Sequence, residues 1–76
     1  MGNAIAQYFI GLMYKSGEGI KKDKINSYVW VNMSAAQGNK EALKIRKWYD
    51  SYLSKTELLS AQEISKQCFE KKYINC

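Results

Sequence analysis

The sequence GNAIA at residues 2–6 returns thirty-six residues later as GNKEA at residues 38–42. Between the two copies lie two segments with apolar residues at helical spacing, joined by a Gly-x-Gly turn at residues 17–19. A period of about 20 to 50 residues is typical of solenoids, whose units stack because no unit buries its apolar face alone. The sequence therefore predicts a helical repeat protein.

Length and composition favour a single small helical domain. The chain has 76 residues, no proline and five glycines, and strand-like alternation is not sustained anywhere. With 46% apolar residues it is too hydrophobic for a disordered chain. No apolar run approaches the roughly 20 residues that cross a bilayer, so we expect no membrane span.

Capping residues predict where the helices begin. Asn3, Asp23 and Asn39 are suitable N-caps, because their side chains can accept hydrogen bonds from the first turn of a helix. Ser54 and Glu57 have the spacing of a capping box. The expected helices cover about residues 4–15, 24–37, 40–53 and 55–71.

The apolar spacing also predicts which side of each helix faces the core. The expected core residues are Ala6, Phe9, Ile10 and Met13, then Ile25, Val29, Met33 and Ala36, then Ala42, Ile45, Tyr49, Tyr52 and Leu53, and finally Leu58, Ala61, Ile64 and Cys68. Gly17 is expected to end the first helix in the left-handed conformation that glycine adopts readily.

The residues that set this pattern resemble the Sel-one-like repeats, a family related to the tetratricopeptide repeat. The matched positions are Ala6, Ile10, Gly11, Tyr14, Gly17, Gly19, Ile20, Asp23, Trp30, Ala35, Ala36, Gly38 and Ala42. The resemblance implies an all-α fold, a right-handed α–α solenoid of about two helical hairpins. Gly11 and the small pair Ala35 and Ala36 would let helices approach closely, while Tyr14 and Trp30 would fill the space between them.

The resemblance also implies how the single domain at residues 1–76 is organised. A full repeat would occupy residues 2–37, and a divergent capping helix pair would occupy residues 38–76, because Arg46-Lys47 stands where the repeat motif has leucine and glycine. A second departure is Ser27, where alanine is usual. A helix accepts serine at such a place by bonding its hydroxyl to an earlier carbonyl.

The resemblance further implies a partner-binding surface. In tetratricopeptide-type stacks the first helix of each unit lines a concave surface, which would place Tyr8, Leu12 and Lys15 on it, with Lys44 and Trp48 continuing the line. Exposed aromatic residues near lysines suit a protein or peptide partner. An equally open alternative is that Tyr8 and Trp48 only pack between units.

Two functions follow from this resemblance. The first is a protein–protein interaction module without catalytic activity, which binds a peptide or partner protein on a concave helical surface. The alternative is a structural one, in which the chain caps a longer repeat array or pairs with a second copy as a homodimer.

Several other classes of function have little basis in the sequence. The chain has no histidine, so the most common general base and imidazole ligand are missing, and we expect no enzyme, no cofactor and no small-molecule substrate. Two cysteines are too few for a closed four-ligand zinc site, so no metal is expected. The net charge of +5 raises the question of nucleic acid, but the lysines are scattered, which favours an ordinary solvated surface.

The residues alone leave the two cysteines open, as a disulfide or as two free thiols. In a continuous helix, Cys68 and Cys76 would lie about 12 Å apart along the axis, so a bond requires the chain to turn back. Exported members of the resembled family often end in a similar two-cysteine tail. The resemblance therefore implies a Cys68–Cys76 disulfide and a periplasmic or secreted protein, whereas without the bond a cytoplasmic location is expected.

Overall fold

The computed structural model describes residues 3–71, which form four α-helices and no strand. The helices are α1 (Ala4–Ser16), α2 (Lys24–Ala36), α3 (Lys40–Tyr52) and α4 (Lys55–Glu70). Their ends lie within about a residue of the positions expected from the sequence. The all-α fold class is confirmed, and no helix within the described range is long and apolar enough to cross a bilayer.

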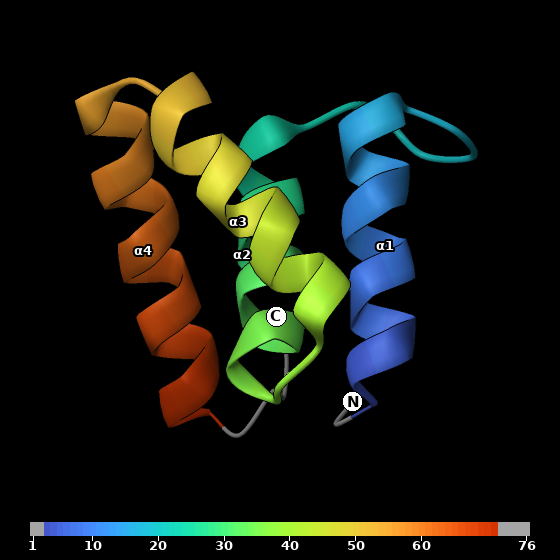
Figure 1. Ribbon diagram of the computed structural model, residues 1–76. Coiled ribbons are helices and arrows are strands. Elements are labelled where there is room, and N and C mark those ends of the chain that lie inside the picture. Colours follow the sequence, from blue (N-terminus) through green and yellow to red (C-terminus); the bar gives the residue numbers. More distant parts are fainter. Residues whose placement is uncertain (1–2, 72–76) are drawn as a thin grey trace.

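The second helix, α2, forms the centre of the molecule. It packs against α1, α3 and α4, and Figure 1 shows α3 crossing in front of it while α1 and α4 flank it. Its buried residues surround most of its circumference: Ser27, Tyr28, Val29, Val31, Met33 and Ser34. A helix buried on nearly all sides cannot have a simple two-sided pattern, which explains why four-residue spacing alone predicted only part of its buried surface.

The repeated sequence pattern at residues 2–6 and 38–42 is a repeated helix cap. The side-chain oxygen of Asn3 accepts a hydrogen bond of 3.0 Å from the N–H of Ala6, and Asn39 accepts one of 3.0 Å from Ala42. Gly17 ends α1 at φ 82°, the left-handed conformation expected for it. These cap predictions are confirmed because each depends only on residues that are close in sequence.

The first two helices approach each other closely at Gly11. A Cβ atom added to Gly11 would lie 2.6 Å from Cγ2 of Val31 and 3.3 Å from the carbonyl oxygen of Ser27. The hydroxyl of Ser27 donates a hydrogen bond of 2.7 Å to the carbonyl oxygen of Gly11. The expectation that Ser27 would bond an earlier carbonyl in its own helix is wrong, because the carbonyl of Gly11 on α1 lies within reach.

The hydroxyl of Ser27 is also an acceptor. The hydroxyl of Tyr49 on α3 donates to it at 2.8 Å, so a buried chain of two hydrogen bonds connects α3, α2 and α1. Burial raises the pKa of Tyr49, which keeps this phenol protonated as a donor at neutral pH. The three helices are therefore held together by a specific polar contact as well as by apolar packing.

Apolar side chains gather in two buried clusters, and the first of them includes Tyr49. The first contains Tyr28, Tyr49, Leu53 and Ala61, with Ile25, Ile45 and Leu58 packed against it. The second contains Val29, Met33 and Cys68, with Trp30 and Phe69 packed against it. Both clusters include residues of α2 and α4, which shows how α4 is anchored to the central helix.

The expected core face of α1 is wrong. Its buried residues are Gln7 and Gly11, whereas Phe9 is 56% exposed and Met13 is 38% exposed. Lys15 is the only charged residue of α1, so its apolar spacing does not single out one side. The close contact with α2 determines which side of α1 is buried, because only the side that carries Gly11 can approach α2 so closely.

Three other expected core residues lie on the surface. Ala36 is exposed at the last position of α2, and Tyr52 and Ile64 are exposed on α3 and α4. On α4 the inward position next to Ile64 is taken by Ser65, whose hydroxyl donates to the carbonyl oxygen of Ala61 at 2.9 Å. An internally bonded serine can be buried at little cost, and apolar spacing does not reveal it.

Of the two cysteines, Cys68 belongs to the second cluster, where its Sγ lies 2.9 Å from Sδ of Met33. Cys76 lies outside the described residues. The Cys68–Cys76 disulfide and the compartment inferred from it therefore stay predictions.

The close contact at Gly11 predicts whether Gly11→Ala raises or lowers the free energy of unfolding. In an exposed helix, Gly→Ala stabilises by about 1 kcal/mol through helix propensity. Here Gly11→Ala should instead lower the free energy of unfolding by about 1–3 kcal/mol, because the added methyl group forces α1 and α2 apart. Urea unfolding followed by circular dichroism measures the change, and an unchanged or higher midpoint would contradict the close approach.

Candidate functional site

Two adjoining pockets lie between α1 and α3. The first, about 330 Å³, is called the lysine pocket and is lined by Lys15, Lys22, Lys24, Trp48, Tyr49 and Tyr52. The second, about 400 Å³, is called the Tyr8 pocket and is lined by Tyr8, Lys15, Glu41, Lys44, Ile45 and Trp48. Because Lys15 and Trp48 line both, the pockets are the two ends of one groove, here called the α1–α3 groove.

Four of the five residues expected on a binding surface, all except Leu12, line this groove. They are Tyr8, Lys15, Lys44 and Trp48. Leu12 is half-buried and lines neither pocket. It lies about 40° further around α1 than Tyr8, which turns it away from α3.

Sequence reasoning missed the residues that complete the lysine pocket. Lys22 and Lys24 come from the turn before α2 and from its first residue, and Tyr52 comes from the end of α3. The four-residue spacing of Trp48 and Tyr52 was a usable signal that these side chains are neighbours. No local signal shows that the turn before α2 lies next to the end of α3.

Trp48 is exposed and yet held in place by other aromatic rings. Its ring stacks on Tyr52, with centroids 4.5 Å apart and planes inclined by 16°, and it meets the ring of buried Tyr49 edge-on at 5.0 Å. About 45% of its surface remains exposed. Stacked and edge-on aromatic pairs stabilise each other beyond simple burial, so the indole is oriented before any ligand arrives.

Two lysines from other helices complete this arrangement. The ammonium of Lys15 on α1 lies 4.8 Å from the centre of the Trp48 ring, and that of Lys24 on α2 lies 5.8 Å from the centre of the Tyr52 ring. Each is within the distance of a cation–π interaction. The aromatic pair of α3 is thus connected to both α1 and α2.

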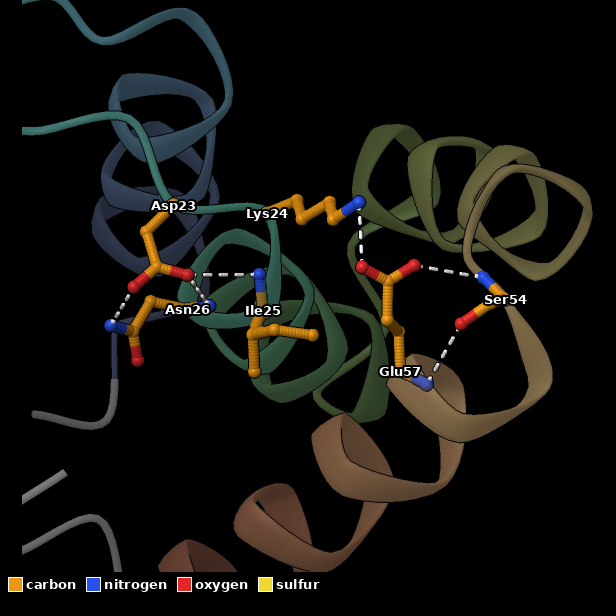
Figure 2. Close-up of polar contacts among 6 residues, drawn as sticks. All are labelled: Asp23, Lys24, Ile25, Asn26, Ser54 and Glu57. Atoms are coloured by element: carbon orange, nitrogen blue, oxygen red, sulfur yellow. Dashed lines mark hydrogen bonds and ion pairs between the residues drawn. The ribbon is translucent and has the colours of Figure 1, made fainter.

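Lys24 also forms an ion pair with Glu57 on α4, as Figure 2 shows. Its Nζ lies 2.6 Å from one carboxylate oxygen, while the other oxygen accepts the N–H of Ser54 at 3.0 Å in the capping box of α4. The hydrogen bond from Lys24, followed by that from Ser54, lowers the pKa of Glu57, and the same bond raises the pKa of Lys24. Both groups therefore stay charged at neutral pH.

The start of α2 is fixed beside this ion pair. Figure 2 shows the carboxylate of Asp23 accepting from the N–H groups of Ile25 and Asn26, at 3.0 and 3.1 Å. The N–H of Asp23 in turn donates to the carbonyl oxygen of Tyr14 near the end of α1, at 2.9 Å. These bonds hold the segment with Lys22 and Lys24 against the rest of the groove.

The described residues contain no cluster of three or more histidine, cysteine or acidic side chains that could hold a metal ion. No protein-family model, curated protein or solved structure matches the chain.

The ion pair between Lys24 and Glu57 predicts a pH dependence of stability. A carboxylate whose pKa is lowered by folding contributes stability above its ordinary value near 4.5, and this is lost as the pH falls through the folded-state pKa. The variant Glu57→Gln should therefore be less stable than the wild type at pH 7, and the difference should shrink as the pH falls below 4.5.

Thermal unfolding at a series of pH values measures this difference. Glu63→Gln, which changes an exposed carboxylate on the same helix, is the control and should show a smaller difference at pH 7. A gap between wild type and Glu57→Gln that stays constant into acid would contradict the role of the ion pair.

Proposed function

We propose that the chain is a protein–protein interaction module that binds a peptide or partner segment in the α1–α3 groove and catalyses no reaction. The observation that carries this proposal is the position of Trp48, which is exposed, held by Tyr49 and Tyr52, and placed where the two pockets meet. Buried aromatic anchors dominate the energetics of protein interfaces. An anchor that is ordered in advance loses little side-chain freedom on binding.

The proposal includes no catalytic step and no cofactor. The chain has no histidine, and Glu41 is the only carboxylate among the residues that line the described groove. It lies 3.6 Å from the ammonium of Lys44, as an exposed pair on one face of α3. Such a pair is typical of a solvated helix surface, and general acid–base chemistry would need a carboxyl group in a less exposed setting.

We further propose that the architecture is a Sel-one-like repeat of the right-handed solenoid type, with α1 and α2 as a full repeat and α3 and α4 as a divergent cap. The repeated N-caps Asn3 and Asn39 support this proposal, as does the close approach of α1 and α2 at Gly11. In such an arrangement α1 and α3 are equivalent helices of successive units. The groove between them would then belong to the concave surface.

Peptide binding predicts a selective effect of Trp48→Ala. Peptides selected from a random octapeptide library for binding to the wild type should bind the variant at least about tenfold more weakly, because the anchor of the interface is removed. Leu59→Ala removes a similarly exposed side chain on α4 and should change the affinity less than twofold.

Fluorescence anisotropy of the selected peptides measures both affinities, and far-ultraviolet circular dichroism should show the same helix content in all three proteins. Peptides that bind Trp48→Ala as tightly as the wild type would contradict the groove as the binding site. Loss of the helical signal in Trp48→Ala would instead mean that Trp48 is needed for folding.

A second candidate function, self-association, is favoured by the outer face of α1. Ile5, Phe9 and Met13 follow one another at four-residue spacing, and all three are exposed. Phe9 and Met13 stand thirty-six residues before Ile45 and Tyr49, which pack into the cluster that joins α3 to α2. The equivalent face of α1 is therefore of the kind that a further helix covers, and we propose a second copy of the chain as its source.

Self-association predicts a concentration-dependent mass in sedimentation experiments. The wild type should form dimers as its concentration rises, because pairing buries the exposed apolar face of α1. Phe9→Gln should sediment as a monomer, whereas Leu59→Gln should behave as the wild type does. A wild type that stays monomeric up to about 1 mM would rule out this candidate.

A further inference from the structure

Positive charge is concentrated at one end of the α1–α3 groove. Among the described residues, the lysine pocket is lined by three lysines and no carboxylate. The Tyr8 pocket contains both signs of charge, since Glu41 and Lys44 lie 3.6 Å apart there, and its lining also includes Ile45. The groove is therefore cationic at one end and of mixed polarity at the other.

Two of the three lysines in the lysine pocket have no carboxylate partner in the part of the chain that the structure describes. Lys24 is paired with Glu57, but neither Lys15 nor Lys22 has a carboxylate within 4 Å among residues 3–71. Lys15 instead lies over the ring of Trp48. Lys15 and Lys22 thus bring two uncompensated positive charges to a pocket of about 330 Å³.

The local backbone holds Lys22 in this position. The bond from the N–H of Asp23 to the carbonyl oxygen of Tyr14 fastens the next residue to α1. The side chain of Lys22 begins beside Gly17. A Cβ atom added to Gly17 would lie 3.3 Å from the Cβ atom of Lys22. The end of α1 therefore sets the direction in which the exposed Lys22 side chain leaves the backbone.

From this arrangement we propose that the lysine pocket binds the carboxylates of an acidic peptide. This inference rests on the proposed function of the groove. It adds the chemistry of the partner and says which part of the peptide lies at each end of the groove. Two neighbouring Asp or Glu side chains of the peptide pair with Lys15 and Lys22. Its apolar residues lie over Trp48 and continue toward Tyr8 and Ile45.

The charge distribution favours an acidic peptide over a nucleic acid. A single-stranded nucleic acid is a continuous polyanion that needs a positive groove along its whole length. The Tyr8 pocket contains Glu41 and the apolar Ile45, which suit a peptide that changes from acidic to apolar along the groove. Steep salt dependence alone would not distinguish these ligands, so both belong in the test.

Three pools of octapeptides test the proposal. Each pool has two fixed adjacent residues, Glu-Glu, Gln-Gln or Lys-Lys, and random residues at the other positions, displayed on beads and exposed to the fluorescently labelled chain. An exposed ion pair changes an affinity by about two- to fivefold, so two pairs should give roughly tenfold more protein on the Glu-Glu pool than on the Gln-Gln pool. The Lys-Lys pool should retain the least.

Two charge variants locate the effect. Lys22→Gln should reduce the preference for Glu-Glu over Gln-Gln to about threefold or less, because one of the two charges is removed. The control Lys66→Gln makes the same change at an exposed position on α4 and should leave the preference at its wild-type value.

The outcomes separate this inference from the function on which it rests. Equal retention of the Glu-Glu and Gln-Gln pools, with retention still lost in Trp48→Ala, overturns the acidic partner and leaves peptide binding in the groove intact. No retention of any pool overturns both. An equal loss of preference in Lys22→Gln and Lys66→Gln, or tighter binding of a twelve-nucleotide oligothymidylate than of the Glu-Glu peptides, overturns the assignment of the lysine pocket to carboxylates.

Discussion

Ser27 on the central helix connects three of the four helices through one hydroxyl group. It donates to the carbonyl oxygen of Gly11 on α1 and accepts from the hydroxyl of Tyr49 on α3. A buried hydrogen bond contributes about 0.5–1.5 kcal/mol, and a partner left unsatisfied in the interior costs more, about 1–3 kcal/mol. The geometry is available only because Gly11 has no side chain to hold α1 away from α2.

The position of the groove follows from this contact. Tyr49 points inward to Ser27, so its neighbour Trp48 points outward toward α1 and lines both pockets. On α1, the side that carries Gly11 is turned to α2, which leaves Tyr8 and Lys15 on the flank that faces α3. The two walls of the groove are therefore oriented by the same pair of hydrogen bonds that joins the helices in the interior.

Sequence reasoning succeeded where the physical cause is local. The caps at Asn3 and Asn39 depend on a bond that spans three residues, and the end of α1 depends on the conformation of Gly17 alone. It failed for the orientation of α1, because a helix with one charged residue has no clear polar side and its neighbour selects the face. It also missed the destination of the Ser27 hydroxyl, which bonds a residue sixteen positions away.

The candidate groove residues show the same division between local and long-range causes. The resemblance to a repeat family placed Tyr8, Leu12, Lys15, Lys44 and Trp48 on one surface. All of these except Leu12 line one groove. The lysine pocket was not anticipated, because it forms only when the turn before α2 lies against the end of α3. Contacts between segments far apart in the chain leave no periodic signal in the sequence.

A double-mutant cycle between Ser27 and Tyr49 tests the connection between the interior and the groove most directly. The free energy of unfolding would be measured for the wild type, Ser27→Ala, Tyr49→Phe and the double variant. Because the two side chains share a buried hydrogen bond, we expect a coupling free energy of about 1 kcal/mol. A coupling within about 0.3 kcal/mol of zero would mean that the bond does not hold α3 to α2 and would contradict this origin of the groove.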